Sequence, residues 1–181
     1  NIWRPVTIEG GYDASFNVAD GWSIYSGTGM VGTVFTLSGN SEGAHIVVKN
    51  VDIRNAFSPT WNGAAAQIHS GAVVDLENCI FSNNTSLQLA GAADVSGAST
   101  ATFSQCVFRS NRSFRSPSVI HIYRADAAFE GCEFDSNIFE GDTGGALIHL
   151  TTNAAHSVSF QDCVFTNTTG TFVTTGGEGD G

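Results

Sequence analysis

The stretch VDLENCIFSNN (residues 74–84) returns three more times, with substitutions, further along the chain. The copies are ATFSQCVFRSN (101–111), AAFEGCEFDSN (127–137) and VSFQDCVFTNT (158–168). Their cysteines, Cys79, Cys106, Cys132 and Cys163, are 26 to 31 residues apart. A near-constant period of this length is typical of proteins built from stacked structural repeats.

Alignment on the cysteines shows apolar residues at every second position on both sides of a two-residue corner such as Glu77-Asn78. This period of two predicts strands with one buried face. The main inward columns are Gly11, Val51, Cys79, Cys106, Cys132 and Cys163; Ile53, Phe81, Phe108, Phe134 and Phe165; and Ile8, Val48, Leu76, Phe103, Phe129 and Phe160.

Each repeat holds a further alternating segment, expected at 34–38, 65–69, 92–96, 119–123 and 147–151. No segment has the 3.6-residue period of a crossover helix, which excludes a doubly wound sheet and an α/β barrel. A single coil cannot bury its apolar side, so coils of two to three short strands must stack. We therefore predict an all-β, right-handed, single-stranded parallel β-helix of about six rungs over residues 1–175, followed by a Gly-rich linker or tail at 176–181.

Short motifs beside the repeats resemble those of a known family. GGAL (144–147), with its variants NGAA (62–65) and LAGA (89–92), accompanies FSNN, FRSN and FDSN. These segments resemble the GGA[ILV] and FxxN repeats of bacterial polymorphic outer-membrane proteins and similar surface β-helix proteins. PVTIEGGYDASF (5–16) resembles the entry coil of such extracellular proteins. The resemblance implies a secreted or cell-surface protein.

The charge balance limits the partners. Seven basic and 17 acidic residues give a net charge of −10, which argues against nucleic acid and against anionic membrane surfaces. No apolar run is long enough to cross a bilayer, so we expect no direct membrane insertion. The chain shows no charged leader followed by an apolar run, and we expect it to be an excised or processed piece of a longer protein.

The cysteines are expected in one inward column. Side chains that leave adjacent strands in parallel are badly oriented for the torsion angle that a disulfide requires. We therefore predict buried free thiols that act as small apolar residues. Bridges between Cys79 and Cys106 or between Cys132 and Cys163 are the alternative. The spacing does not match that of metal sites, and we expect no metal and no cofactor.

One outward column collects the residues most suited to chemistry. Asp94, His121 and His149 are expected on successive rungs, close enough to share a proton or a metal ion, and they are the catalytic residues if the protein is an enzyme. The alternative is that they are solvated residues made adjacent by the repeat. The ligand or partner face is expected to comprise Gln67, His69, Asp94, His121, Tyr123, Arg124 and His149.

Two further surface features are predicted. Sequons begin at Asn83, Asn84, Asn111 and Asn167, and we expect them at an exposed corner where a glycan can be attached. The alternative is that the stacked fold itself favours Asn at this corner and the sequons are coincidental. Ile80, Val107 and Val164 face outward between the Cys and Phe columns. Such apolar residues fit a lateral contact with another surface protein or another copy, or else coverage by a neighbouring loop.

These observations favour a non-enzymatic, extracellular cell-surface module with a structural or adhesive role. Its expected partners are a surface protein or a glycan, other copies of itself, or the rest of its own chain, and not nucleic acid. Two alternatives remain: a polysaccharide lyase-like or hydrolase-like enzyme or carbohydrate-binding β-helix, and a subunit of an extracellular filament or wall layer.

Overall fold

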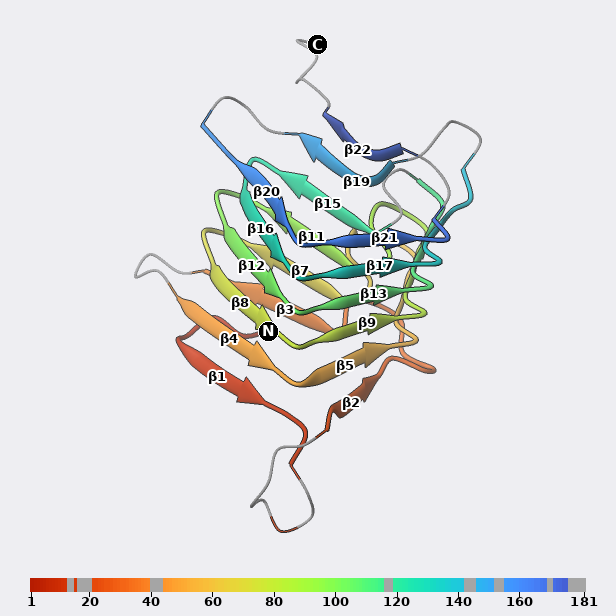
Figure 1. Ribbon diagram of the computed structural model, residues 1–181. Helices are drawn as coiled ribbons and strands as arrows, with labels where there is room; N and C mark the ends of the chain where they lie inside the picture. The colour runs from red at the N-terminus through yellow and green to blue at the C-terminus, as the bar shows by residue number, and fades with distance from the viewer. Residues whose placement is uncertain are drawn as a thin grey trace.

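The strands expected from the repeat are present, and they stack coil upon coil along one axis (Figure 1). This computed structural model describes residues 1–12, 15, 21–39, 44–115, 119–141, 146–151, 155–168 and 171–175. Within these residues every regular element is a β-strand. The expected tail at 176–181 lies outside the described residues.

Three long sheets run the length of the stack, and all their strands are paired in parallel. The first contains β1 (Val6–Glu9), β4 (His45–Lys49), β8 (Val73–Glu77), β12 (Thr100–Ser104), β16 (Asp126–Glu130) and β20 (Val158–Gln161). The second contains β2 (Ser23–Ser26), β5 (Val51–Arg54), β9 (Ile80–Ser82), β13 (Val107–Arg109), β17 (Glu133–Asp135) and β21 (Val164–Thr166). The third contains β3 (Phe35–Ser38), β7 (Ala66–His69), β11 (Ala93–Ser96), β15 (Ile120–Tyr123), β19 (Ala146–Thr151) and β22 (Thr171–Thr175). These three sheets of six strands confirm the predicted parallel β-helix of about six rungs.

A fourth, short sheet was not expected. It contains β6 (Phe57–Ser58), β10 (Thr85–Ser86), β14 (Arg112–Ser113) and β18 (Ile138–Phe139). Strands of two residues are too short to show a period of two in the sequence, which is why the repeat did not reveal them.

The core is built from two columns of stacked phenylalanine rings. Along the second sheet, the ring centroids of Phe81, Phe108, Phe134 and Phe165 are successively 5.0, 4.7 and 4.7 Å apart. Along the first sheet, Phe103, Phe129 and Phe160 follow at 4.9 and 4.8 Å. The two columns meet edge to face at 5.6 to 6.4 Å, an arrangement that aromatic pairs favour. The predicted register, with Phe108 against Phe134, is therefore confirmed.

A column of buried asparagines runs beside the aromatic rings. The Asn84 side-chain amide donates to Asn111 Oδ1 at 3.0 Å, and that of Asn111 donates to Asn137 Oδ1 at 3.1 Å. Each amide also donates to a backbone carbonyl of the preceding coil, such as Asn84 to Ile53 at 3.0 Å. Because polar groups removed from water need partners, this ladder satisfies a position that the fold buries in every coil.

The asparagine ladder corrects part of the glycosylation prediction. Asn84 and Asn111 are fully buried, and their side chains are hydrogen-bonded on both sides, so these two sequons do not lie at an exposed corner. The exposed corner residue comes one position earlier, where Asn83 has a φ of 54°. Asn167 occupies the equivalent corner at 50° and is also exposed.

The first coil departs from the aligned columns. In the first sheet Glu9 pairs with Lys49, and the next strand of this coil begins at Ser23 in the second sheet, where Ser23 pairs with Val51. Ser23 rather than Gly11 therefore occupies the Cys column in this coil. Gly11 has a φ of 84° and lies in the connection between these two strands, which a single-sequence alignment reads as part of the strand.

The four cysteines are free, as predicted, and the alternative of bridged pairs is not realised. Cys79, Cys106 and Cys132 are buried, whereas Cys163 in the last aligned coil is only half-buried. Each thiol donates to a carbonyl of the preceding coil, for example Cys106 to Leu76 at 3.3 Å and Cys132 to Phe103 at 3.2 Å. Burial raises the pKa of the Cys106 thiol well above its ordinary value.

Truncation of the central ring tests the packing. Phe108→Ala removes a fully buried ring that stacks on two others, and we expect it to lower the free energy of unfolding by about 3–5 kcal/mol in urea denaturation. Phe114→Ala, at an exposed ring, is the matched control and should cost less than about 1 kcal/mol. Equal losses in the two variants would show that the stacked core is assigned wrongly.

Thiol labelling tests the cysteine column. In denaturant without reductant, a thiol reagent should modify all four cysteines. In the native protein Cys163 should react first, because it is the only one of the four with appreciable exposure. Two or no reactive thiols in the denatured protein would mean that adjacent coils are bridged.

Candidate functional site

The outer face of the third sheet carries an in-register column of polar side chains. Thr36 pairs with Gln67, Gln67 with Asp94, Asp94 with His121, and His121 with His149. The parallel register therefore places residues about 30 positions apart in sequence on neighbouring strands. A second column, two residues on, contains Ser38, His69, Ser96, Tyr123 and Thr151.

Asp94 and His121 form a tight buried pair within this column. The Nδ1–H of His121 donates to Oδ1 of Asp94 at 2.7 Å, because an ionised carboxylate can only accept. Ser96 Oγ donates to the other carboxylate oxygen at 3.1 Å. The exposed fractions are only 7% for Asp94 and 8% for His121, so the interpretation of these two as solvated residues was wrong.

A close turn explains part of this burial. Gly63 has a φ of 68° and lies so near β11 that a Cβ added there would be 2.7 Å from the Asp94 backbone nitrogen and 3.1 Å from its Cβ. Only glycine fits both the conformation and the approach. The turn thus covers one side of Asp94, and the sequence alone does not show this because Gly63 is 31 positions away.

His149 extends the pair to a group of three. Its ring centroid is 5.8 Å from that of His121, with the planes tilted by 44°. Burial lowers the pKa of His149, and the neighbouring His121 ring lowers it further, because two charged imidazoles would repel each other. The neutral imidazole, which has a free lone pair, is therefore favoured at this position.

Tyr123 and Arg124 continue the same surface. The Tyr123 ring stacks against His121 at 6.2 Å, and the Arg124 guanidinium lies 5.2 Å from the centre of the Tyr123 ring. Such a cation–π contact fixes the orientation of both side chains. Tyr123 and Arg124 thus lie beside the Asp94–His121 pair, and their role as a ligand face stays a prediction.

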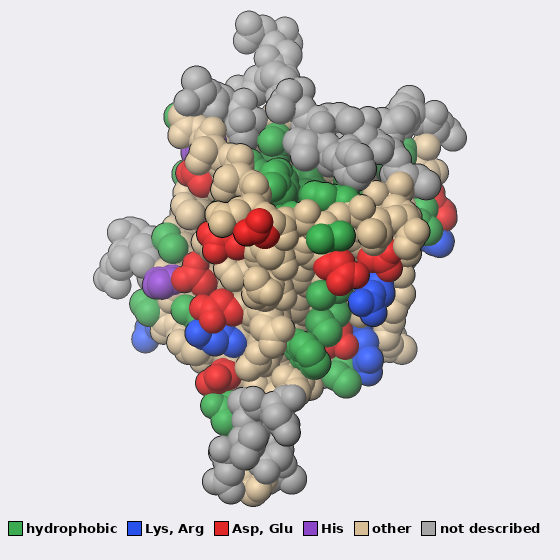
Figure 2. Space-filling model, viewed as in Figure 1, with side chains coloured by type: hydrophobic (Ala, Val, Ile, Leu, Met, Phe, Trp, Pro, Cys, Tyr) green, Lys and Arg blue, Asp and Glu red, His purple; other side chains and the backbone are tan. Residues whose placement is uncertain are grey.

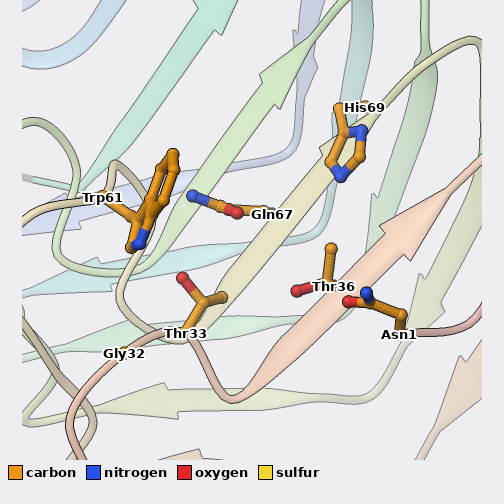
Figure 3. Close-up of a pocket in the computed structure, with 7 residues that line it drawn as sticks. All are labelled: Asn1, Gly32, Thr33, Thr36, Trp61, Gln67 and His69. Atoms are coloured by element: carbon orange, nitrogen blue, oxygen red, sulfur yellow. The ribbon is translucent and has the colours of Figure 1, made fainter.

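An open pocket lies at the N-terminal end of this face (Figure 3). It has a volume of about 380 Å³ and is lined by Asn1, Gly32, Thr33, Thr36, Trp61, Gln67 and His69. Figure 3 shows the Gln67 amide between the Trp61 indole and the His69 imidazole. Gln67 is held by donation to the Asn62 carbonyl at 2.7 Å, and His69 Nδ1 contacts Ser70 Oγ at 2.8 Å.

Of the pocket residues, the sequence predicts Gln67 and His69 for the ligand face and Thr36 for the same outward column. Trp61 is 63% exposed, and it comes immediately before the NGAA motif. A large aromatic residue at a turn, where burial is not expected, is the sequence feature that could have indicated a binding role for Trp61. Asn1 and Thr33 come from other coils, so no local pattern indicates them.

The predicted lateral apolar surface faces outward from the second sheet. Figure 2 shows hydrophobic side chains in a column on this side of the molecule, with acidic and basic side chains next to them. Ile80 and Val107 are half-buried between their neighbours, and Val164 is 55% exposed. Asp52 and Glu133 interrupt the column. A partner for this surface stays a prediction.

The two exposed sequon asparagines differ in their surroundings. Asn83 borders a shallow groove with Thr85, Ser110, Arg112 and other corner residues. The Asn167 amide donates to Asp135 Oδ1 at 2.9 Å, and this bond lowers the pKa of the Asp135 carboxyl. Use of either sequon stays a prediction.

Two features that would indicate other functions, a cluster of metal ligands and a membrane-spanning helix, are absent from the described residues. No three His, Cys, Asp or Glu side chains among them converge as the ligands of a metal ion. No helix that is long and apolar enough to span a membrane is found in the described part of the chain.

The stacked parallel coils and their ladders of like side chains define a β-helix solenoid. The family model for the right-handed β-helix region matches residues 17–180. The chain therefore belongs to the right-handed β-helix family, as its repeat predicted. Searches of curated proteins and of solved structures found no significant match.

Proposed function

We propose that this chain is an extracellular cell-surface β-helical module, part of a longer protein, that binds a glycan through the outer face of its third sheet and is not an enzyme. The observation that carries this proposal is the open pocket with the exposed Trp61 indole. Its polar side chains are amides, hydroxyls and an imidazole, and no carboxylate, lysine or arginine side chain lines it.

The chemistry of the pocket favours a hydroxylated, neutral ligand. An exposed indole offers a flat apolar surface, and binding sites combine such surfaces with a few fixed polar groups. Gln67 and Thr33 provide those groups, and both are already oriented: Gln67 by Asn62, and Thr33 by donation to the Gly63 carbonyl at 3.1 Å. A sugar ring presents both an apolar face and hydroxyls at its edge, which matches this arrangement.

The scaffold suits an adhesive role. Backbone ladders connect each coil to the next, and asparagine and phenylalanine ladders reinforce the later coils, so side chains on the outer face are held at fixed spacing. Solenoids commonly use such extended surfaces for binding. The resemblance of the GGAL and FxxN segments to polymorphic outer-membrane proteins also supports a place at the cell surface.

Substitution of Trp61 tests the glycan-binding proposal. The purified protein is screened against a panel of neutral and acidic glycans, and the affinity for the best one is measured by calorimetry. Trp61→Ala should weaken that affinity at least tenfold, which is about 1.4 kcal/mol. Trp22→Ala, at an exposed tryptophan outside the pocket, should stay within about threefold. Equal affinities of wild type and Trp61→Ala would refute binding at this pocket.

A polysaccharide-acting enzyme is the second candidate, and the Asp94–His121 hydrogen bond favours it. A buried carboxylate that orients an imidazole is a common element of general-base catalysis. Asp94 lies one coil beyond Gln67 and His121 lies two coils beyond it, so a glycan that extends along the sheet from the pocket would reach the pair.

An activity assay separates the two candidates. If the protein is a binding module, incubation with polygalacturonate, alginate or chondroitin, with or without Ca²⁺, should release no oligosaccharide. Because none of the three residues lines the pocket, the triple variant Asp94→Asn, His121→Gln, His149→Gln, if it is folded, should then bind the pocket ligand within about 1 kcal/mol of wild type. Release of product by the wild type that is absent in the triple variant would establish the enzyme instead.

A further inference from the structure

The two neighbouring imidazoles on the third sheet have a geometry that the glycan pocket does not use. His121 on β15 and His149 on β19 are direct partners in the parallel register, so both side chains leave the same face at adjacent positions. Asp94 on β11 is the partner of His121 on the other side. The order across the sheet is therefore carboxylate, imidazole, imidazole.

The contact with Asp94 sets the chemistry of the His121 ring. Since Nδ1–H donates to the carboxylate at 2.7 Å, the proton of the neutral ring lies on Nδ1, and Nε2 carries a lone pair. Within the described residues, neither Nε2 of His121 nor either nitrogen of His149 makes a hydrogen bond. Asp94 is itself held by Ser96 and is almost fully buried, so the orientation of the His121 ring is fixed.

The spacing of the rings fits one shared ion. A metal–nitrogen bond of about 2.0–2.1 Å places each ring centroid about 3.2 Å from the ion. Two such rings have centroids about 4.5 Å apart at the right angle of square-planar coordination, about 5.2 Å apart at a tetrahedral angle and at most about 6.4 Å apart when opposite. The observed separation of 5.8 Å falls between these limits.

We propose that His121 and His149 bind a divalent first-row transition-metal ion through two imidazole nitrogens, and that Asp94 positions His121. A carboxylate that accepts from the far nitrogen of a metal-bound histidine is the usual partner of such ligands. Because Asp94 contacts the ring rather than the ion, the site has two protein ligands, and water completes the coordination. This assignment agrees with the lack of a three-ligand cluster among the described residues. The site does not depend on the glycan proposal.

Titration with Ni²⁺ tests the site, because imidazole nitrogen is a favoured ligand of this ion and Ni²⁺ does not oxidise thiols as Cu²⁺ does. Calorimetry on the wild-type chain, freed of any affinity tag, should show one ion per chain. His121→Gln and His149→Gln should each lower the affinity at least 30-fold. Asp94→Asn should lower it by about 10- to 100-fold and leave one site.

His45 provides the matched control. Its Nε2 contacts Asp75 Oδ2 at 2.7 Å, so it forms the same kind of His–Asp pair, but no second imidazole contacts its ring within the described residues. His45→Gln should retain wild-type affinity. The unfolding temperature of every variant without metal establishes that each is folded, and His149→Gln, at the more exposed histidine, keeps the test valid if His121→Gln unfolds.

Three results would overturn the proposal. They are the absence of saturable binding by the wild type at millimolar Ni²⁺, equal affinities of wild type and His149→Gln, and loss of the site in His45→Gln. Unchanged affinity in Asp94→Asn would refute the positioning role of that carboxylate, but not metal binding by His121 and His149. Loss of glycan binding with intact Ni²⁺ binding would refute only the proposed function.

Discussion

The in-register stacking of identical side chains is the constraint on which the structure depends. Parallel strands lie about 4.8 Å apart, and an aromatic ring on one coil is therefore at stacking distance from the ring at the same position of the next. The observed centroid distances of 4.7 to 5.0 Å match this spacing. A slip of one residue would turn each buried ring to the solvent, so the Phe columns fix the register of the coils from Phe81 to Phe165.

The same repeat distance determines which polar residues can be buried. An asparagine amide has donors and an acceptor, and in a stack each can reach the equivalent residue of a neighbouring coil. Asn84, Asn111 and Asn137 satisfy one another and the adjacent backbone in this way. Cysteine is used differently: its small thiol fills the space at the corner between the first and second sheets and donates a weak hydrogen bond to a carbonyl of the preceding coil.

The outer face is free of these restrictions, and this is where the chain varies from coil to coil. In the third sheet the successive residues Thr36, Gln67, Asp94, His121 and His149 share a column but not a chemical type. The fixed spacing of the coils turns this variation into a surface with a pocket at one end and a pair of imidazoles further along. Local coverage by turns such as that at Gly63 then creates burial on a face that a bare sheet would expose.

The sequence by itself determined the core columns and the parallel coils, because both follow from a period of two and a repeat of near-constant length. It also placed Asp94, His121 and His149 on successive strands. Tertiary structure alone decided which of them are buried, since the turn over Asp94 comes from another coil. It alone showed that Asn84 is buried and Asn83 exposed, because the left-handed backbone conformation of Asn83 turns the chain at this corner. The pocket around Trp61 was likewise decided by the tertiary structure, because stacking brings its walls together from the N-terminus and two later coils.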